Sequence, residues 1–259
     1  MTHLTVQYPS ICMGTNMNFH VLLPKVRPGV FENEYVPPNK DFPVLYLLHG
    51  AFDDGFTWIK RTNICELVDT YGIAVVLPDA GNSFYINAEH GYPFFSYLTE
   101  ELYEYVQEIF PVTKDPKKTF IGGCSMGGYG SLNAILKTTN KYSKAVLFSS
   151  AVSLRASAIF VNGFNGHMPT ELCDRKAVKT SDFNPLYVLE NESYICNPKD
   201  VSLYLACGDK DFTRSDNEKL VSLLKEKGFE LVDLLDEGDH LWGYWDAHLD
   251  AALKWLLNE

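Results

Sequence analysis

The feature that most constrains the fold is an alternation of short apolar runs with segments of helical periodicity. Six runs contain few polar residues, as do strands that are buried on both faces of a sheet. Strands that alternate with helices form a mainly parallel sheet covered by helices on both faces. We therefore predict an α/β fold that forms one domain over residues 1–259. The six runs are VLYLLHG, IAVVLPD, KTFIGG, KAVLFSS, VSLYLACG and FELVDLL.

Two further strands, LTVQYP and MNFHVLLP, are predicted before this alternation, because both are rich in β-branched and aromatic residues and are bounded by Pro or Gly. Hydrophobic residues make up 46% of the chain, which is enough for the large core that such a sheet needs. The helices are expected over residues 57–71, 96–110, 126–137, 215–227 and 244–257.

One connection is much longer than the others. About 50 residues, 151–200, separate the runs KAVLFSS and VSLYLACG, whereas ordinary connections in a compact domain contain a few residues. This segment includes IFVNGFNGHMP, which is apolar and rich in Gly and Asn. We predict that it is a cap or lid inserted beside the functional site, within the same domain.

Charge and composition restrict the partners. The net charge of −11 argues against binding to a nucleic-acid backbone or to an anionic membrane. The chain shows no secretory signal pattern and no apolar run as long as a membrane span. On these grounds we expect a cytoplasmic protein. Its six cysteines form no C-x-x-C pair, which gives no support to a zinc ribbon or a thioredoxin motif, and several lie in apolar runs, so we expect buried, reduced thiols. The many aromatic residues would allow a homo-oligomer, although the sequence shows no interface.

The pattern that points to chemistry is G-x-S-x-G at residues 123–127, between the run KTFIGG and a predicted helix. A strand that turns sharply into a helix exposes its serine, here Ser125, and leaves no room for side chains two positions before and after it. The Met126 N–H would then face a developing oxyanion. The alternative is a serine that only caps the helix, but both flanking glycines favour a nucleophile.

A second oxyanion donor should come from the loop after VLYLLHG. We predict the backbone N–H of Ala51, with Phe52 as the near alternative. For the side chain of His49, a structural role that holds this turn by hydrogen bonds is favoured, because the chemistry requires only backbone groups here.

The base and the acid should follow the serine, in the order Ser, acid, His. His240 lies in a loop between the last predicted strand and the closing helix, whereas His248 lies inside that helix. Asp211 and Asp209 both follow VSLYLACG; the spacing favours Asp211 and leaves Asp209 as the fallback. Together, Ser125, His240 and the acid predict acyl transfer, which requires no metal or organic cofactor.

The chain resembles the putative esterase family of α/β hydrolases, which includes esterase D, tributyrin and feruloyl esterases. The resemblance extends from about Asn16 to the end of the chain and implies the α/β-hydrolase fold. It also implies that the catalytic residues are Ser125, Asp211 and His240. The motifs that carry it are LYLLHG, WIKRTNI, VVLPDAGNSFYIN, YLTEELYEYVQEIFP, FIGGCSMGGYGSL, CGDKDF and GDHLWGYWD.

The same resemblance implies a serine carboxylesterase that hydrolyses small soluble esters, most similar to tributyrin esterases. The alternatives are a feruloyl or acetyl-xylan esterase, an acyltransferase, and a thioesterase similar to S-formylglutathione hydrolases. Those hydrolases carry His after the serine motif where this chain has Tyr129, which disfavours a glutathione thioester. A different class of function, an inactive binding protein on the same fold, is disfavoured because every catalytic role has a candidate residue.

Aromatic residues near these motifs are candidates for an apolar substrate pocket. Core packing is at least as good an explanation for any one of them. The candidates are Phe52, Trp58, Tyr85, Phe94, Phe95 and Trp242.

Overall fold

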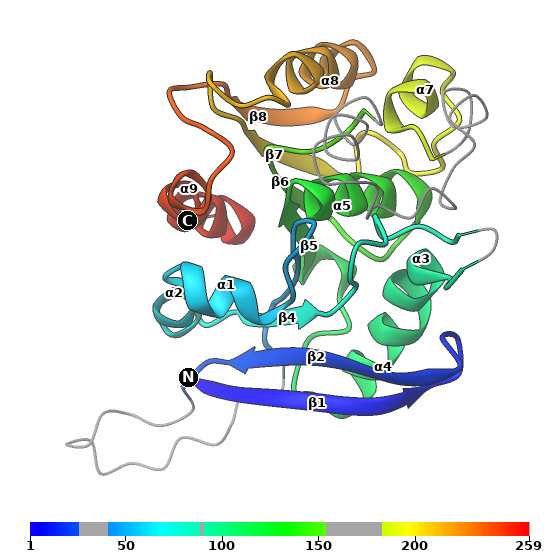
Figure 1. Ribbon diagram of the computed structural model, residues 1–259, viewed down its shortest axis with the longest axis vertical. Coiled ribbons are helices and arrows are strands. Elements are labelled where there is room, and N and C mark those ends of the chain that lie inside the picture. Colours follow the sequence, from blue (N-terminus) through cyan, green and yellow to red (C-terminus); the bar gives the residue numbers. More distant parts are fainter. Residues whose placement is uncertain (26–40, 89–90, 154–182, 259) are drawn as a thin grey trace.

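One eight-stranded sheet, in the order β1-β2-β4-β3-β5-β6-β7-β8, runs through the molecule (Figure 1). The computed structural model describes residues 1–25, 41–88, 91–153 and 183–258. At one edge, β1 (Thr2–Ser10) and β2 (Thr15–Leu23) form an antiparallel hairpin, and β2 pairs antiparallel with β4 (Ala74–Pro78). These strands include the two that were predicted before the alternation.

The remaining strands are parallel, as the alternation predicted. Every residue of β3, β4 and β5 is buried, which explains why these runs contain almost no polar residues. The carboxyl ends of the parallel strands all lie at one edge of the sheet, where the candidate residues follow them. Across the sheet from β4, the parallel strands follow in the order β3 (Val44–Leu48), β5 (Thr119–Cys124), β6 (Lys144–Phe148), β7 (Ser202–Ala206) and β8 (Glu230–Leu234).

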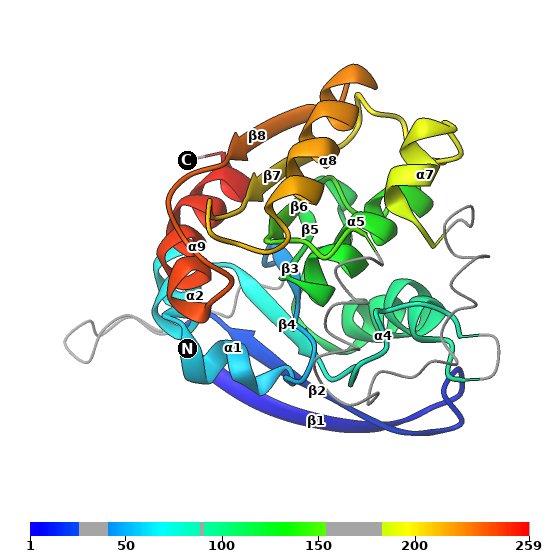
Figure 2. The same cartoon turned by 45° about the horizontal axis from the view of Figure 1, so that its top comes forward.

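Helices cover both faces of the sheet (Figure 2). Each face has its own hydrophobic core. On one face, side chains from three helices pack against the sheet: α1 (Phe56–Arg61), α2 (Ile64–Tyr71) and α9 (Trp242–Leu257). On the other face, the core includes side chains of α4 (Leu102–Ile109), α5 (Met126–Lys137), α7 (Pro185–Glu190) and α8 (Arg214–Glu226). Three shorter helical segments are also described: α3 (Phe94–Ser96), the π-helix η1 (Tyr97–Glu101) and the 3₁₀ helix η2 (Pro116–Lys118).

The single helix predicted over residues 57–71 is wrong, because the structure has two helices there, α1 and α2. The break is at Thr62, whose backbone is extended and whose hydroxyl donates to the Trp58 carbonyl at 2.6 Å. Asn63 then starts α2 and donates its backbone N–H to the Asp246 carboxylate of α9 at 2.8 Å. These side-chain contacts compete with the backbone bonds that would continue one helix, and apolar periodicity does not reveal them.

The helix expected over residues 96–110 is present but irregular. Between α3 and α4 it contains a π-helical turn, η1 (Tyr97–Glu101). The Glu101 carboxylate at its end accepts hydrogen bonds from the backbone N–H groups of Ile11 (2.7 Å) and Cys12 (3.2 Å). This contact fastens the β1–β2 turn to the helix.

The predicted cap, residues 151–200, can be described only in part, because residues 154–182 lie outside the described residues. Within the described part, Asn184 caps α7 by accepting hydrogen bonds from the N–H groups of Leu186 and Tyr187. Helix α7 then packs against α5 and α8. The role of a cap beside the site therefore stays a prediction.

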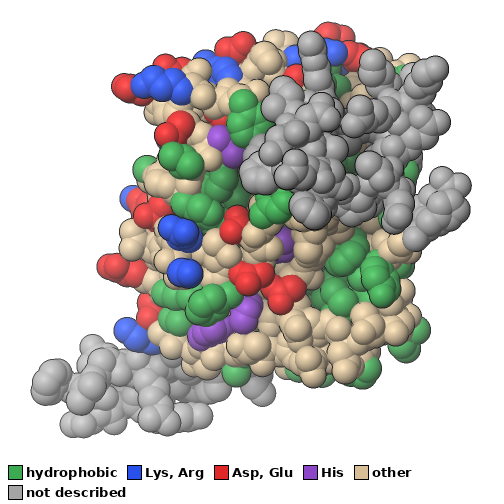
Figure 3. Space-filling view, in the orientation of Figure 1, with side chains coloured by type: hydrophobic (Ala, Val, Ile, Leu, Met, Phe, Trp, Pro, Cys, Tyr) green, Lys and Arg blue, Asp and Glu red, His purple; other side chains and the backbone are tan. Residues whose placement is uncertain are grey.

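The described surface carries dispersed charge. In Figure 3, acidic side chains are spread over the visible face with basic ones among them, in keeping with the net charge of −11. No helix within the described residues is long and apolar enough to cross a membrane.

The buried Trp58 provides a test of the core. Its indole N–H donates to the Leu48 carbonyl at 3.1 Å, and its ring has no exposed surface. Replacing Trp58 by Ala should lower the free energy of unfolding by about 3–5 kcal/mol. On the same helix, Phe56 is 43% exposed, and Phe56→Ala should cost about 0.5 kcal/mol. Urea denaturation of both variants is the measurement, and equal losses would contradict this packing.

Candidate active site

Ser125 lies at the turn between β5 and α5 in a strained backbone conformation. Its φ is 54° and its ψ −114°, in a region that non-glycine residues rarely adopt. Backbone hydrogen bonds hold it there: its N–H donates to the Phe148 carbonyl at 2.9 Å, and its carbonyl accepts from Tyr129 and Ala151 at 3.1 Å. The turn thus fixes the direction in which the hydroxyl points.

The glycines of the motif are required by close approach, as predicted. A Cβ atom on Gly127 would lie 2.3 Å from the Leu48 carbonyl oxygen, and one on Gly123 would lie 2.6 Å from the same atom. Real Cβ atoms do not come so near to backbone oxygens. The turn can therefore lie against the end of β3 only if both positions are glycine.

The structure brings Ser125, His240 and Asp211 together from three separate loops. His240 follows β8, Asp211 follows β7, and Ser125 follows β5, so all three lie at the carboxyl edge of the sheet. The Nε2 atom of His240 is 3.0 Å from the Ser125 Oγ, and its Nδ1 atom is 2.9 Å from both Asp211 oxygens. An ionised carboxylate only accepts, so Nδ1 carries the proton and Nε2 accepts from the serine hydroxyl.

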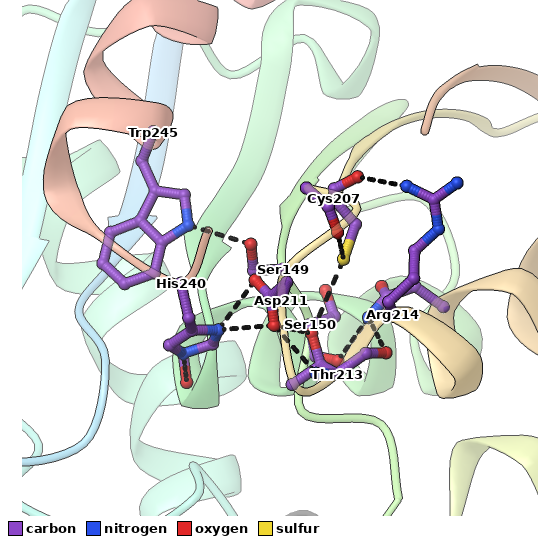
Figure 4. A network of polar contacts seen from close by, with 11 residues as sticks. Ser149, Ser150, Cys207, Asp211, Thr213, Arg214, His240 and Trp245 are labelled. Carbon is purple, nitrogen blue, oxygen red and sulfur yellow. Dashed lines mark hydrogen bonds and ion pairs between the residues drawn. The ribbon is translucent and has the colours of Figure 1, made fainter. Parts of the chain in front are cut away.

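Asp211 lies in a buried, hydrogen-bonded environment (Figure 4). Burial opposes its ionisation, but hydrogen bonds and charge from His240, with hydrogen bonds from Ser149 and Thr213, outweigh it and lower the pKa of Asp211. Thr213 contributes its N–H at 2.8 Å and its hydroxyl at 2.7 Å, both to Oδ1. The carboxylate is therefore charged and fixed in direction.

The fallback acid, Asp209, has a different place. Its carboxylate accepts the Gly238 N–H at 3.0 Å, and its own N–H donates to the Asp236 carbonyl at 2.7 Å. Asp209 thereby ties the loop after β7 to the loop that carries His240. It supports the loops, whereas Asp211 contacts the imidazole.

The other histidines near the motifs have structural contacts. His248 pairs with Asp236 at 3.4 Å from its position on α9. The buried His49 donates from Nδ1 to the Gly50 carbonyl at 2.7 Å, and its Nε2 accepts the Ala80 N–H at 3.0 Å. Burial lowers the pKa of His49, which keeps it neutral. This agrees with the structural role favoured for its side chain.

Two aromatic rings enclose the His240 imidazole. Phe212 lies 4.3 Å from it, centroid to centroid, and Trp245 lies 5.2 Å away with an interplanar angle of 86°. The Trp245 indole N–H also donates to the Ser149 hydroxyl at 3.0 Å. The rings restrict rotation of the imidazole, so its orientation does not depend on Asp211 alone.

Two backbone N–H groups beside Ser125 have no acceptor among the described residues, namely those of Ala51 and Met126. Met126 is the first residue of α5, and Gly50 packs so closely that a Cβ on it would lie 3.6 Å from the Ser125 Cβ. The Phe52 N–H, by contrast, donates to the Asn82 Oδ1 at 2.7 Å. Ala51 therefore fits the second oxyanion donor better than Phe52 does.

The candidate substrate-binding residues differ in how far they are exposed. The Phe52 side chain is 46% exposed, next to Ala51. Trp58 and Tyr85 are buried, and Tyr85 donates its hydroxyl to the His49 carbonyl at 3.1 Å, so these two support the core rather than present a surface to a ligand. Trp242 is half-buried and packs edge-on against Trp58 at 4.9 Å. Phe94 and Phe95 are also half-buried.

Sequence reasoning missed several residues that hold the site. Thr213 could have been found, because a Thr two residues after an Asp commonly bonds to it in a turn. Ser149, Trp245 and Asn82 gave no comparable signal, since their contacts join segments far apart in the chain.

The arrangement is suited to nucleophilic chemistry at a carbonyl. A serine hydroxyl, an imidazole and a buried carboxylate in hydrogen-bonded series can transfer the serine proton as its oxygen attacks. Within the described residues, no group of three or more His, Cys, Asp or Glu side chains could hold a metal ion.

Comparisons with known proteins agree with this chemistry. The model of the family described as "Putative esterase" matches residues 10–256. An acetyl esterase of Caldicellulosiruptor saccharolyticus is 29% identical over 265 residues, 99% of this chain and 98% of the relative. An S-formylglutathione hydrolase of Bos taurus is 27% identical and covers 80% of each chain. The structure of FphF, a fluorophosphonate-binding serine hydrolase of Staphylococcus aureus, superposes with a TM-score of 0.83 and 28% identity over 100% of this chain and 99% of that one.

The two candidate acids can be separated by the rate at which a fluorophosphonate labels Ser125. Asp211→Asn should slow labelling by about 10⁴-fold, because an amide cannot hold the Nδ1–H tautomer of His240. Asp209→Asn keeps that contact intact and should stay within about threefold of the unmodified chain. A larger loss in the Asp209 variant would reverse the assignment.

The lowered pKa of Asp211 also predicts a dependence of stability on pH. A carboxylate whose pKa is lower in the folded chain stabilises the fold in full above its unfolded pKa, about 3.9, and loses that contribution as pH falls through the folded value. The gap in unfolding free energy between the unmodified chain and Asp211→Asn should therefore shrink between pH 5 and pH 3. Urea denaturation at both pH values measures it; a gap that grows below pH 4 would contradict the assignment.

Proposed function

We propose that this chain, which belongs to the family described as "Putative esterase", hydrolyses small esters of short-chain acids through Ser125, His240 and Asp211. The observation that carries the proposal is the continuous series of contacts from Asp211 through His240 to Ser125, with distances of 2.9 and 3.0 Å. The strained turn at Ser125 supports it, because such a turn presents a nucleophile.

In this mechanism, the Ser125 Oγ attacks the ester carbonyl while His240 Nε2 takes its proton. The oxyanion that forms lies between the N–H groups of Ala51 and Met126. His240 then gives its proton to the departing alcohol, which leaves an acyl group on Ser125. Water, deprotonated by His240, attacks this acyl-enzyme. The bond between the acyl carbon and the Ser125 oxygen then breaks, the acid is released, and His240 returns the proton to the Ser125 oxygen. Asp211 stays ionised throughout and holds the Nδ1–H of His240.

Two observations support a small, uncharged acyl ester. The acetyl esterase matches this chain over nearly its whole length. Three exposed apolar side chains adjoin the residues of the site in sequence: Phe52 after Ala51, Phe212 after Asp211, and Leu241 after His240. They offer contacts to the apolar part of a substrate, and aromatic or aliphatic contacts of this kind favour neutral groups.

A thioester substrate is the second candidate, and the S-formylglutathione hydrolase relative favours it. The same residues would perform that reaction, because a thioester carbonyl forms the same tetrahedral oxyanion. The two candidates differ in the leaving group, a thiol or an alcohol. S-formylglutathione and an acetyl ester differ in the acyl group as well, so kcat/KM should be compared for S-acetylglutathione and an acetyl ester, and then for S-formylglutathione.

We also propose that the enzyme is cytoplasmic. The five described cysteines, Cys12, Cys65, Cys124, Cys196 and Cys207, are all free thiols, which fits a reducing compartment. A homo-oligomer stays a prediction.

The test is hydrolysis of p-nitrophenyl esters by the unmodified chain and by Ser125→Ala. The variant should lose at least about 10⁴-fold in kcat, because no other group replaces the nucleophile. For the unmodified chain, kcat/KM should be higher for acetate and butyrate than for octanoate. Activity that survives in Ser125→Ala would overturn the mechanism, and a preference for octanoate would overturn the substrate class.

A further inference from the structure

The loop of residues 80–86, which we call the brace loop, follows β4 and contacts both sides of the proposed oxyanion hole. It corresponds to the sequence AGNSFYI, part of a motif to which the mechanism above assigns no role. One side of the hole is the segment 49–52, which carries Ala51. The other is the start of α5, which carries Met126.

On the first side, three hydrogen bonds join the brace loop to the segment 49–52. The Ala80 N–H donates to His49 Nε2 at 3.0 Å, and the Tyr85 hydroxyl donates to the His49 carbonyl at 3.1 Å. The third is the bond from the Phe52 N–H to the Asn82 Oδ1 at 2.7 Å. Asn82 is therefore the side chain of this loop that holds the residue next to Ala51.

On the second side, the brace loop packs against the first turns of α5. The Phe84 N–H lies 3.3 Å from the Met126 Sδ, and the Phe84 ring packs edge-on against Tyr129 at 5.5 Å. The Tyr85 ring is so close to α5 that a Cβ on Gly130 would lie 2.6 Å from it. The brace loop therefore contacts both of the segments that carry the proposed oxyanion donors.

The Ala51 N–H lies in the peptide plane that it shares with the Gly50 carbonyl, and the next plane, joined to the first at the Ala51 Cα, carries the Phe52 N–H. In a trans peptide the C=O and the N–H point in opposite directions. His49 Nδ1 holds the Gly50 carbonyl at 2.7 Å, which turns the Ala51 N–H of the same plane to the other side. Asn82 holds the next plane through the Phe52 N–H. Phe52 has a φ of 67°, in the left-handed region that a phenylalanine rarely adopts without such a contact.

We propose that Asn82 is a positioning residue for the oxyanion hole: its side-chain oxygen locks the peptide between Ala51 and Phe52, and so keeps the Ala51 N–H directed at the substrate oxygen. This inference rests on the proposed function, in which Ala51 is an oxyanion donor. Asn82 acts through Phe52 and Ala51 and carries out no proton transfer. Its contribution falls on the transition state, where the charge on the oxygen develops.

The experiment compares Asn82→Ala with Asn82→Asp, which keeps an acceptor oxygen in the same place. Asn82→Ala should lower kcat for p-nitrophenyl butyrate by about 10- to 100-fold and change KM by less than about threefold, because a displaced donor weakens transition-state binding more than substrate binding. Asn82→Asp keeps the acceptor but adds a negative charge near the oxyanion, so it should lose some activity, yet clearly less than Asn82→Ala. An unchanged kcat in Asn82→Ala, or an equal loss in both variants, would overturn the proposal.

A trifluoromethyl ketone, which forms an oxyanion adduct with the serine, provides a readout that a general loss of stability would not move. Its inhibition constant should rise in Asn82→Ala by the same factor by which kcat/KM falls. The matched control is Asn87→Ala, since Asn87 follows the brace loop but bonds to Ser96 at 3.0 Å. Asn87→Ala should lower the melting temperature and leave the inhibition constant unchanged; an equal rise in both variants would overturn the proposal.

Ser125→Ala, measured in the same series, separates this inference from the proposed function. If Ser125→Ala keeps its activity, the proposed mechanism is wrong and Asn82 has no oxyanion hole to position. If Ser125→Ala is inactive while Asn82→Ala behaves as the unmodified chain does, the mechanism stands and the role of Asn82 is wrong.

Discussion

The close approach of the β5–α5 turn to the end of β3 is the constraint on which the site depends. Gly123 and Gly127 both lie so close to the Leu48 carbonyl that neither position has room for a side chain. This contact sets the position of Ser125 above the sheet edge. It also brings Ser125 beside Gly50, the residue before Ala51, so one packing contact brings together the segments that carry the proposed nucleophile and a proposed backbone donor.

The remaining groups reach the serine because parallel strands end at the same edge. Asp211 follows β7 and His240 follows β8, two strands that are neighbours in the sheet. The loops after these strands are bonded to each other through Asp209, and Thr213 and Ser149 hold the Asp211 carboxylate. The rigid sheet therefore determines the distances, and the polar side chains determine the orientations, as an active site of fixed geometry requires.

Apolar runs and glycine spacing were enough to predict the sheet and the turn at Ser125. The candidates Asp211 and His240 required, in addition, the expected chain order of serine, acid and histidine and the family resemblance. Apolar runs could not predict the break at Thr62, where a side chain closes a helix that periodicity would continue. The sequence also left open whether Trp58 and Tyr85 line a pocket or pack in the core, because an aromatic residue near a motif has the same signature in both places. Asn82 was missed for a different reason. Its partner, the Phe52 N–H, lies 30 residues away in the chain, and the positive φ of Phe52 is seen only in the folded structure.

The most direct measurement is to treat the protein with one equivalent of a fluorophosphonate, map the label by peptide mass spectrometry, and follow esterase activity in the same sample. The account predicts one phosphonyl group per chain, on Ser125, and a loss of activity in proportion to labelling. A label on another residue, or full labelling of Ser125 with activity retained, would contradict the claim that Ser125 is the nucleophile.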